Sequence, residues 1–144
     1  TGVQTCALPI WLSGRLPPLE CFRDLGLRVA IGTDSRASNP DLSVLAECRV
    51  LVEAGLASPA EAITMATRHG AWAVSLERRC GLLAPGRAAD LAVLRPAGPS
   101  ADPFAAALDP ATVVLATMRS GRWIHGSLAG PGSVTAGSSR SASR

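Results

Sequence analysis

Residues Leu27–Glu47, which read LRVAIGTDSRASNPDLSVLAE, combine an apolar strand, a polar loop and the start of a helix. The continuous apolar run from Leu27 to Ile31 is typical of a strand that is covered on both faces. Gly32-Thr33-Asp34 ends this strand and leaves a carboxylate at its carboxyl end. A buried strand followed at once by a helix predicts one unit of a parallel α/β fold.

The second half of this stretch predicts a helix from Asp41 to Ala54, which Gly55 ends. Ser38 or Asn39 can cap this helix, with Pro40 at its first position. Glu47, on the helix surface, is expected to be solvated or salt-bridged. The residues that recur at helical spacing, and therefore predict the core face, are Leu42, Leu45, Cys48 or Arg49, and Val52.

Helices are also expected on both sides of this unit. A short helix over Leu19–Leu25 ends at Gly26, which suits a helix C-cap. Ser58-Pro-Ala-Glu61 is a capping box that starts a helix running through Arg68. His69 is expected to cap the end of that helix, and a second short helix is expected over Ala71–Leu76.

The rest of the chain reads as a small β-rich appendage. Turn residues Gly81, Pro85 and Gly86 separate the first apolar pieces, and Asp90 is expected to hold backbone there. A short helix over Asp102–Asp109 interrupts the strands. The expected strands are Leu82-Leu83, Leu91–Leu94, Val113–Met118 and Trp123–His125, the last two joined by the turn Ser120-Gly121.

The two ends of the chain differ from its middle. Thr1–Ile10 has no helical or strand period, and it matches the in-frame reading of a common sequencing-adapter oligonucleotide, ACTGGAGTTCAGACGTGTGCTCTTCCGATC. We therefore expect residues 1–10 to be non-native and outside the fold. Ala129–Arg144 is rich in Gly, Ser, Ala and Arg and is predicted to be a disordered tail, because it has too little apolar surface to offset its ordering entropy.

Composition narrows the class of protein. A length of 144 residues favours one domain, and all 14 basic residues are Arg with no cluster, which argues against a nucleic-acid partner. The four cysteines show no C-x-x-C spacing and are expected to be free thiols in the reducing cytoplasm. No apolar run approaches the roughly 18 residues of a membrane span. A cytoplasmic protein is therefore expected.

Three motifs together carry a family resemblance: VAIGTDSRASN, MATRHGAWAVSL and CGLLAPGRAADLAVL. In this order and at these spacings they resemble the carboxyl-terminal third of the amidohydrolase superfamily, in its cytosine deaminase/chlorohydrolase-like branch. The resemblance covers about Ser13 to Gly126. It implies an α/β fold: the last strand and helices of a metal-dependent (β/α)8 TIM barrel over 11–78, and carboxyl-terminal strands of a small β-sandwich over 79–128.

The same resemblance implies a site. Asp34 matches the aspartate after the eighth barrel strand, which ligates Zn²⁺ or Fe²⁺ and moves protons during catalysis. A carboxylate suits this place because reactive groups of such barrels gather at the carboxyl ends of the strands. Ser35, Ser38 and Asn39 follow on the same loop and are candidate substrate-binding residues, with a turn or a helix cap as the alternative role.

The implied reaction is hydrolysis of a non-peptide carbon–nitrogen bond in a small heterocycle, with deamination of a purine, pyrimidine or triazine first. Hydrolysis of a cyclic amide, as in imidazolonepropionase or dihydroorotase, chloride displacement and a non-catalytic β-rich assembly module are the alternatives. The family's remaining metal ligands are histidines, and neither His69 nor His125 matches them. The chain is therefore expected to be a fragment of a longer parent protein and to be inactive alone. The parent could form a homo-oligomer.

Overall fold

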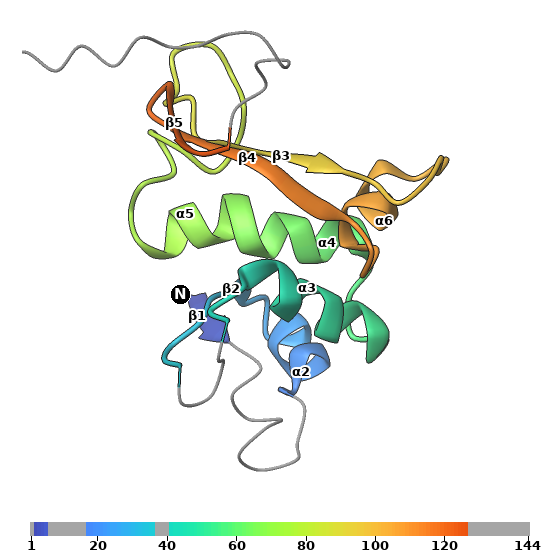
Figure 1. The fold of residues 1–144 in the computed structure, drawn as a ribbon. Coiled ribbons are helices and arrows are strands. Elements are labelled where there is room, and N and C mark those ends of the chain that lie inside the picture. Colours follow the sequence, from blue (N-terminus) through green and yellow to red (C-terminus); the bar gives the residue numbers. More distant parts are fainter. Residues whose placement is uncertain (1, 6–16, 37–40, 127–144) are drawn as a thin grey trace, which may run out of the picture.

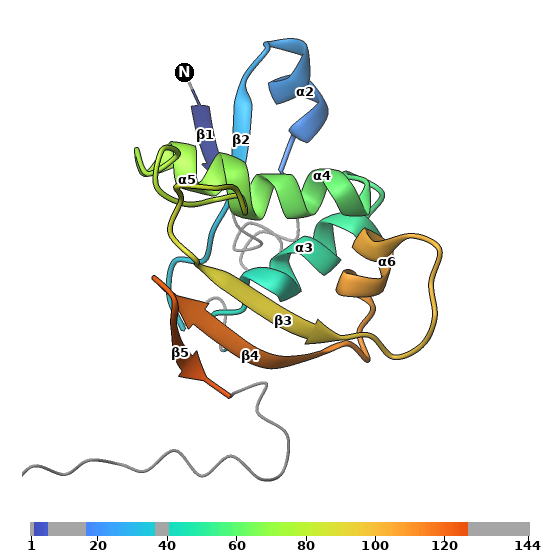
Figure 2. The same cartoon turned by 90° about the horizontal axis from the view of Figure 1, so that it is seen from above.

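The computed structural model describes residues 2–5, 17–36 and 41–126, and in it a continuous helical segment lies between two layers (Figure 1). The central segment comprises α4 (Pro59–Thr64), the π-helical turn η1 (Met65–His69) and α5 (Gly70–Ala73). One layer comprises β1 (Gly2–Thr5), α2 (Leu19–Asp24), β2 (Arg28–Ile31) and α3 (Val44–Glu53). The other layer comprises β3 (Leu91–Arg95), α6 (Pro103–Leu108), β4 (Val113–Arg119) and β5 (Arg122–His125). Figure 2 shows the same elements from above, and in this view α3 lies next to α6.

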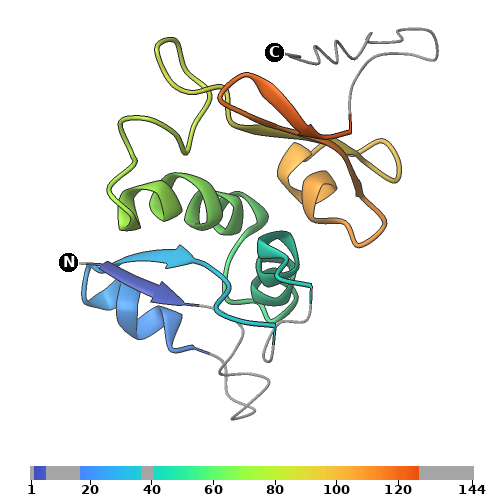
Figure 3. The ribbon, with the colours of Figure 1, turned by 60° about the vertical axis from the view of Figure 1, so that its left-hand side comes forward.

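Strand β2 is the buried strand that the sequence predicts. Val29, Ala30 and Ile31 are all buried, so both faces of the strand are covered. β2 pairs in parallel with β1, with Val3 opposite Val29 (Figure 3). The expectation that all of residues 1–10 lie outside the fold is therefore wrong for Gly2–Thr5, although their origin stays a prediction.

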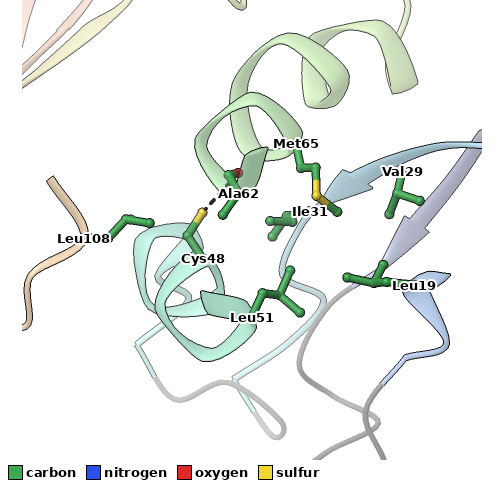
Figure 4. Packing of buried hydrophobic residues seen from close by; sticks show 8 residues of the cluster. All are labelled: Leu19, Val29, Ile31, Cys48, Leu51, Ala62, Met65 and Leu108. Carbon is green, nitrogen blue, oxygen red and sulfur yellow. Dashed lines mark hydrogen bonds between the residues drawn. The ribbon is translucent and has the colours of Figure 1, made fainter. Parts of the chain in front are cut away.

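The core packs against the face of β2 that carries Val29 and Ile31 (Figure 4). Val29 and Ile31 of the strand meet Met65 of η1 and Leu19 of α2. Completing the cluster are Cys48, Leu51, Ala62 and Leu108. Fully burying an aliphatic side chain stabilises a fold by about 1.5–3 kcal/mol, so this cluster fastens β2 to the helices.

Helix α3 begins three residues later than predicted, at Val44 instead of Asp41, and its start has a local cause. Leu42 has a φ of +50°, which a right-handed helix excludes. Ser43 is the N-cap instead, and its hydroxyl accepts a hydrogen bond from the Ala46 N–H at 3.2 Å. The predicted caps Ser38 and Asn39 lie outside the described residues.

The predicted core face of α3 is confirmed at Cys48, which is buried, and at Leu45 and Val52, which pack against the core cluster. The buried residues of α3 are Glu47, Cys48 and Leu51, whereas Leu42 is exposed. Glu47 is only 4% exposed, so the expectation that it is solvated is wrong. Helix α3 packs against both α4 and α6. A helix with two such neighbours buries a wider face than a single apolar stripe predicts.

The helix that begins at Ser58 does not stop before Gly70. Ser58 Oγ accepts from the Glu61 N–H at 3.3 Å, which confirms the predicted cap. The chain then widens into η1 and continues through Gly70, whose φ and ψ of −57° and −48° are helical. The expected separate helix over Ala71–Leu76 is wrong, because a π-helical turn keeps the ladder hydrogen-bonded without a break.

The appendage is an antiparallel sheet of order β3-β4-β5, as predicted except at its first piece. As predicted, Asp90 fixes the position of nearby backbone. Its carboxylate accepts a hydrogen bond from the Ser120 N–H at 2.6 Å, in the turn before β5. Leu82 and Leu83 are exposed and lie in an irregular loop, so the predicted strand there is wrong. No described strand lies beside this pair, and a strand without a partner leaves its backbone groups unpaired.

Arg49 connects α3 to the appendage. Its guanidinium donates to the backbone oxygens of Leu108 at 3.1 Å, Asp109 at 3.0 Å and Thr112 at 3.3 Å. One cation thus satisfies carbonyls at the end of α6 and at the approach to β4. Across the described ranges, no helix combines the length and apolar character needed to cross a membrane.

The described cysteines Cys21, Cys48 and Cys80 are free thiols, as predicted. Burial raises the pKa of the Cys48 thiol from 9.0 to about 11, and the neighbouring Glu47 carboxylate adds to this rise. Between pH 9 and 11 the unfolded chain releases this proton while the folded chain keeps it. The free energy of unfolding should therefore fall by roughly 2–3 kcal/mol as the pH rises through this window.

The chain suits a test of this pH dependence, because it contains no Tyr or Lys to titrate in the same range. Urea unfolding at pH 8, 9 and 10 should give a declining stability for the unsubstituted chain and for Cys21→Ala, whose thiol is exposed. Cys48→Ala should be less stable at pH 8 but show a flatter slope. An unchanged slope in Cys48→Ala would contradict the assignment to this thiol.

Candidate functional site

The candidate site is the carboxylate that follows β2. The strand ends at Ile31, and Gly32-Thr33 lead directly to Asp34, which is exposed. One oxygen of this carboxylate accepts a hydrogen bond from the Ser35 N–H at 2.6 Å. The carboxyl group therefore sits at the carboxyl end of a buried strand with part of its orientation set by the next peptide.

The strand that carries Asp34 is held in place from the helix above it. His69 of η1 has its Nδ1 2.8 Å from the carbonyl oxygen of Val29, so the ring donates to the strand backbone from this nitrogen. The sequence analysis expected His69 to cap a helix end. This expectation is wrong, because the helix continues past His69. The contact connects η1 to the backbone of β2, the strand that precedes Asp34.

Sequence analysis missed this contact of His69. The two partners, His69 and Val29, are 40 positions apart, and no local pattern joins them. The sequence placed His69 only at the end of a predicted helix. A side chain on such a helix can reach a strand carbonyl, but many residues on it could do so.

The other candidate residues divide into two groups. Ser35 lies beside Asp34, is exposed, and contributes its backbone N–H to the carboxylate. Ser38 and Asn39 lie outside the described residues. The structure therefore brings Asp34 and Ser35 together by adjacency, and a substrate contact by any of the three stays a prediction.

The chemistry of Asp34 suits a divalent cation, although the described residues do not complete a metal centre. A carboxylate oxygen is an ordinary ligand of Zn²⁺, but a catalytic zinc site typically takes three protein ligands. Among residues 2–5, 17–36 and 41–126, no three His, Cys, Asp or Glu side chains gather closely enough to hold a metal ion. Asp34 can thus be one ligand of a site that needs others.

Comparison with known proteins assigns the family. A model of the amidohydrolase family matches residues 10–124, and the chain belongs to this family. Imidazolonepropionase from Ralstonia nicotianae is 38% identical over 102 residues, which are 70% of this chain and 25% of that protein. 5-Methylthioadenosine/S-adenosylhomocysteine deaminase from Moorella thermoacetica is 39% identical over 88 residues, 56% of this chain and 21% of that protein. The chain thus spans about a quarter of the length of these relatives.

A solved structure has the same fold over most of the chain. The adenosine deaminase from Xanthomonas campestris, crystallised with bound zinc, aligns with a TM-score of 0.76 at 24% identity. The alignment covers 87% of this chain and 32% of that one. The α/β architecture described above is therefore the architecture of one part of an amidohydrolase-fold enzyme.

Proposed function

We propose that this chain is the carboxyl-terminal part of a metal-dependent hydrolase that acts on non-peptide carbon–nitrogen bonds. The observation that carries the proposal is the place of Asp34, an exposed carboxylate directly after a strand covered on both faces. Reactive groups of (β/α)8 barrels lie at this end of the strands. In the proposed parent, β2 is the last strand of such a barrel.

Asp34 has two tasks in this proposal. Its oxygen binds a zinc or iron ion together with ligands supplied from outside the described residues, and the ion, when bound, makes water more acidic. The carboxylate takes a proton from the attacking water and later gives it to the leaving nitrogen. The bond from the Ser35 N–H and the attachment of β2 to His69 limit the movement of the carboxylate while it does so.

The relatives support two substrate classes. The named deaminase relative favours deamination of a cyclic amidine such as a purine, with a pyrimidine or triazine as further members of the same class. The named imidazolonepropionase relative favours opening of a cyclic amide instead. We place deamination first and amide-ring opening second, and both use the same carboxylate as proton carrier.

The appendage supports the view that the parent contains a second sheet layer. Exposed apolar side chains gather on β4 and β5, namely Val113, Val114, Leu115, Trp123 and Ile124. Several large apolar side chains exposed on neighbouring strands favour a surface that another part of the protein covers. We propose that strands from elsewhere in the parent cover it and complete the β-sandwich over residues 79–128.

The experiment uses the longer protein that is encoded when the reading frame is extended upstream of this segment. The purified protein, supplied with Zn²⁺ or Fe²⁺, is assayed against adenosine-type purines and against imidazolonepropionate. Ammonia release identifies the deaminase, and ring opening without ammonia identifies the cyclic-amide hydrolase. Failure to hydrolyse either class with either metal, together with stable self-assembly, would favour the non-catalytic module.

A further inference from the structure

A concave region lies at the opposite end of β2 from Asp34. It is a cavity of about 370 Å³ between the η1–α5 segment and the loop that follows α5. Arg28 is the first residue of β2, whereas Asp34 follows the last, so the two regions are separated by the strand. Six residues form the part of its wall that matters here: Arg28, Arg68, His69, Trp72, Leu82 and Arg87.

The charged side chains that line this cavity are mostly positive. Three arginines line it, and Glu77 is the one acidic side chain among the lining residues. These arginines come from a strand, a helical turn and a loop that are far apart in the sequence. The sparse basic residues of the primary sequence therefore become a local cluster only after folding, and clusters of Arg suit carboxylate and phosphate groups.

Two of the three arginines are held in position. The Arg28 guanidinium lies 4.5 Å from the ring centroid of Trp72, in a cation–π contact. Arg87 donates to the backbone oxygens of Glu77 and, at 3.3 Å, Cys80, which fastens the loop over the helix. Cation sites that are positioned in advance lose less side-chain entropy when an anion binds.

Arg68 completes the site because its donors are not engaged. Across the described part of the chain, no hydrogen bond or ion pair involves the Arg68 side chain, which is exposed. An arginine presents five N–H donors in a planar arrangement that can bind two oxygens of one oxyanion. Beside it, Leu82 and the ring of Trp72 provide apolar surface.

We propose that this cavity binds a small organic molecule that carries a phosphate or carboxylate group. The oxyanion binds Arg68 and Arg28, and a ring-sized apolar part lies against Leu82. The volume is near the lower end of the range for ligand pockets, which suits one ring and one anionic group rather than a dinucleotide. The site is separate from the proposed catalytic carboxylate and does not depend on it.

Calorimetric titration of the full 144-residue chain tests this proposal. Phenyl phosphate and benzoate are the two probes, and sodium chloride at matched ionic strength is the reference. We expect saturable binding of at least one probe, with preference for one of them identifying the oxyanion. Arg68→Gln should weaken that binding by about tenfold or more, because a charge-assisted hydrogen bond is lost.

Arg122→Gln is the matched control, because it removes an equal charge from an exposed position on β5. The affinity of Arg122→Gln for the probe should stay within twofold of that of the unsubstituted chain. Arg68→Lys should bind the probe more tightly than Arg68→Gln does. Circular dichroism checks that each variant is folded, as expected for exposed positions. The proposal is overturned if neither probe binds saturably, or if Arg68→Gln and Arg122→Gln weaken binding equally.

Discussion

Asp34→Asn in the longer protein is expected to lower kcat/KM by about a thousandfold, within the range observed for loss of a general acid–base group. This corresponds to about 4 kcal/mol of transition-state stabilisation. The side chain keeps its size and one oxygen to accept from the Ser35 N–H, so the loop backbone should not change. What is lost is the ability to take up a proton, and the bound metal should also be held more weakly.

Steady-state kinetics and elemental analysis for zinc and iron measure both effects. Asp41→Asn is the matched control, since Asp41 is an exposed carboxylate between β2 and α3 that accepts from the Ser43 N–H at 3.0 Å. It should leave kcat/KM within about threefold, because that hydrogen bond only shapes the turn before α3. An Asp34→Asn protein that retains ordinary activity would remove the basis of the proposed mechanism.

Gly81→Ala is expected to destabilise the fold by about 3 kcal/mol. The φ of Gly81 is +89°, a region that residues with a side chain rarely adopt. An added Cβ would also lie 2.6 Å from the Ala71 Cβ and 3.0 Å from the Thr67 oxygen, so the loop would have to move away from the helix. Backbone strain and steric overlap therefore act together.

The matched control for Gly81→Ala is Gly86→Ala in the same loop. Gly86 has a similar φ of +80°, but nothing lies within 4 Å of an added Cβ there. Its cost should be about 1–2 kcal/mol, from backbone strain alone. Urea unfolding of both variants at pH 7 measures the difference, and equal losses would show that the close approach of Gly81 to the helix contributes nothing.

Several elements could be predicted from the sequence because their causes lie within a few residues. Gly26 ends α2 with a φ of +64°, and its N–H donates to the Arg23 oxygen at 2.8 Å. Asp102 caps α6 by accepting from the Phe104 N–H at 2.8 Å. The β4–β5 hairpin turns at Ser120-Gly121 as expected. In each case, the residue type decides a hydrogen bond or dihedral angle next to it.

The incorrect predictions concern features that depend on distant contacts. Glu47 was expected to be solvated or salt-bridged, yet only 4% of it is exposed, so solvation is excluded. Leu82-Leu83 has strand composition, but no described strand lies beside it to complete a ladder. The break expected at Gly70 is absent, because the chain stays helical from η1 into α5, with helical dihedral angles at Gly70.

The amino-acid sequence by itself determined β2, the helix after it and the place of Asp34 at the strand's end, because apolar runs and capping residues act over short distances. The family motifs predict a catalytic role for this carboxylate, and that role stays a prediction. Only the tertiary structure decided that His69 bonds Val29 and that Arg28, Arg68 and Arg87 line one cavity. These partners are separated by 19 to 59 positions, and packing of the elements, which no local pattern encodes, brings them together.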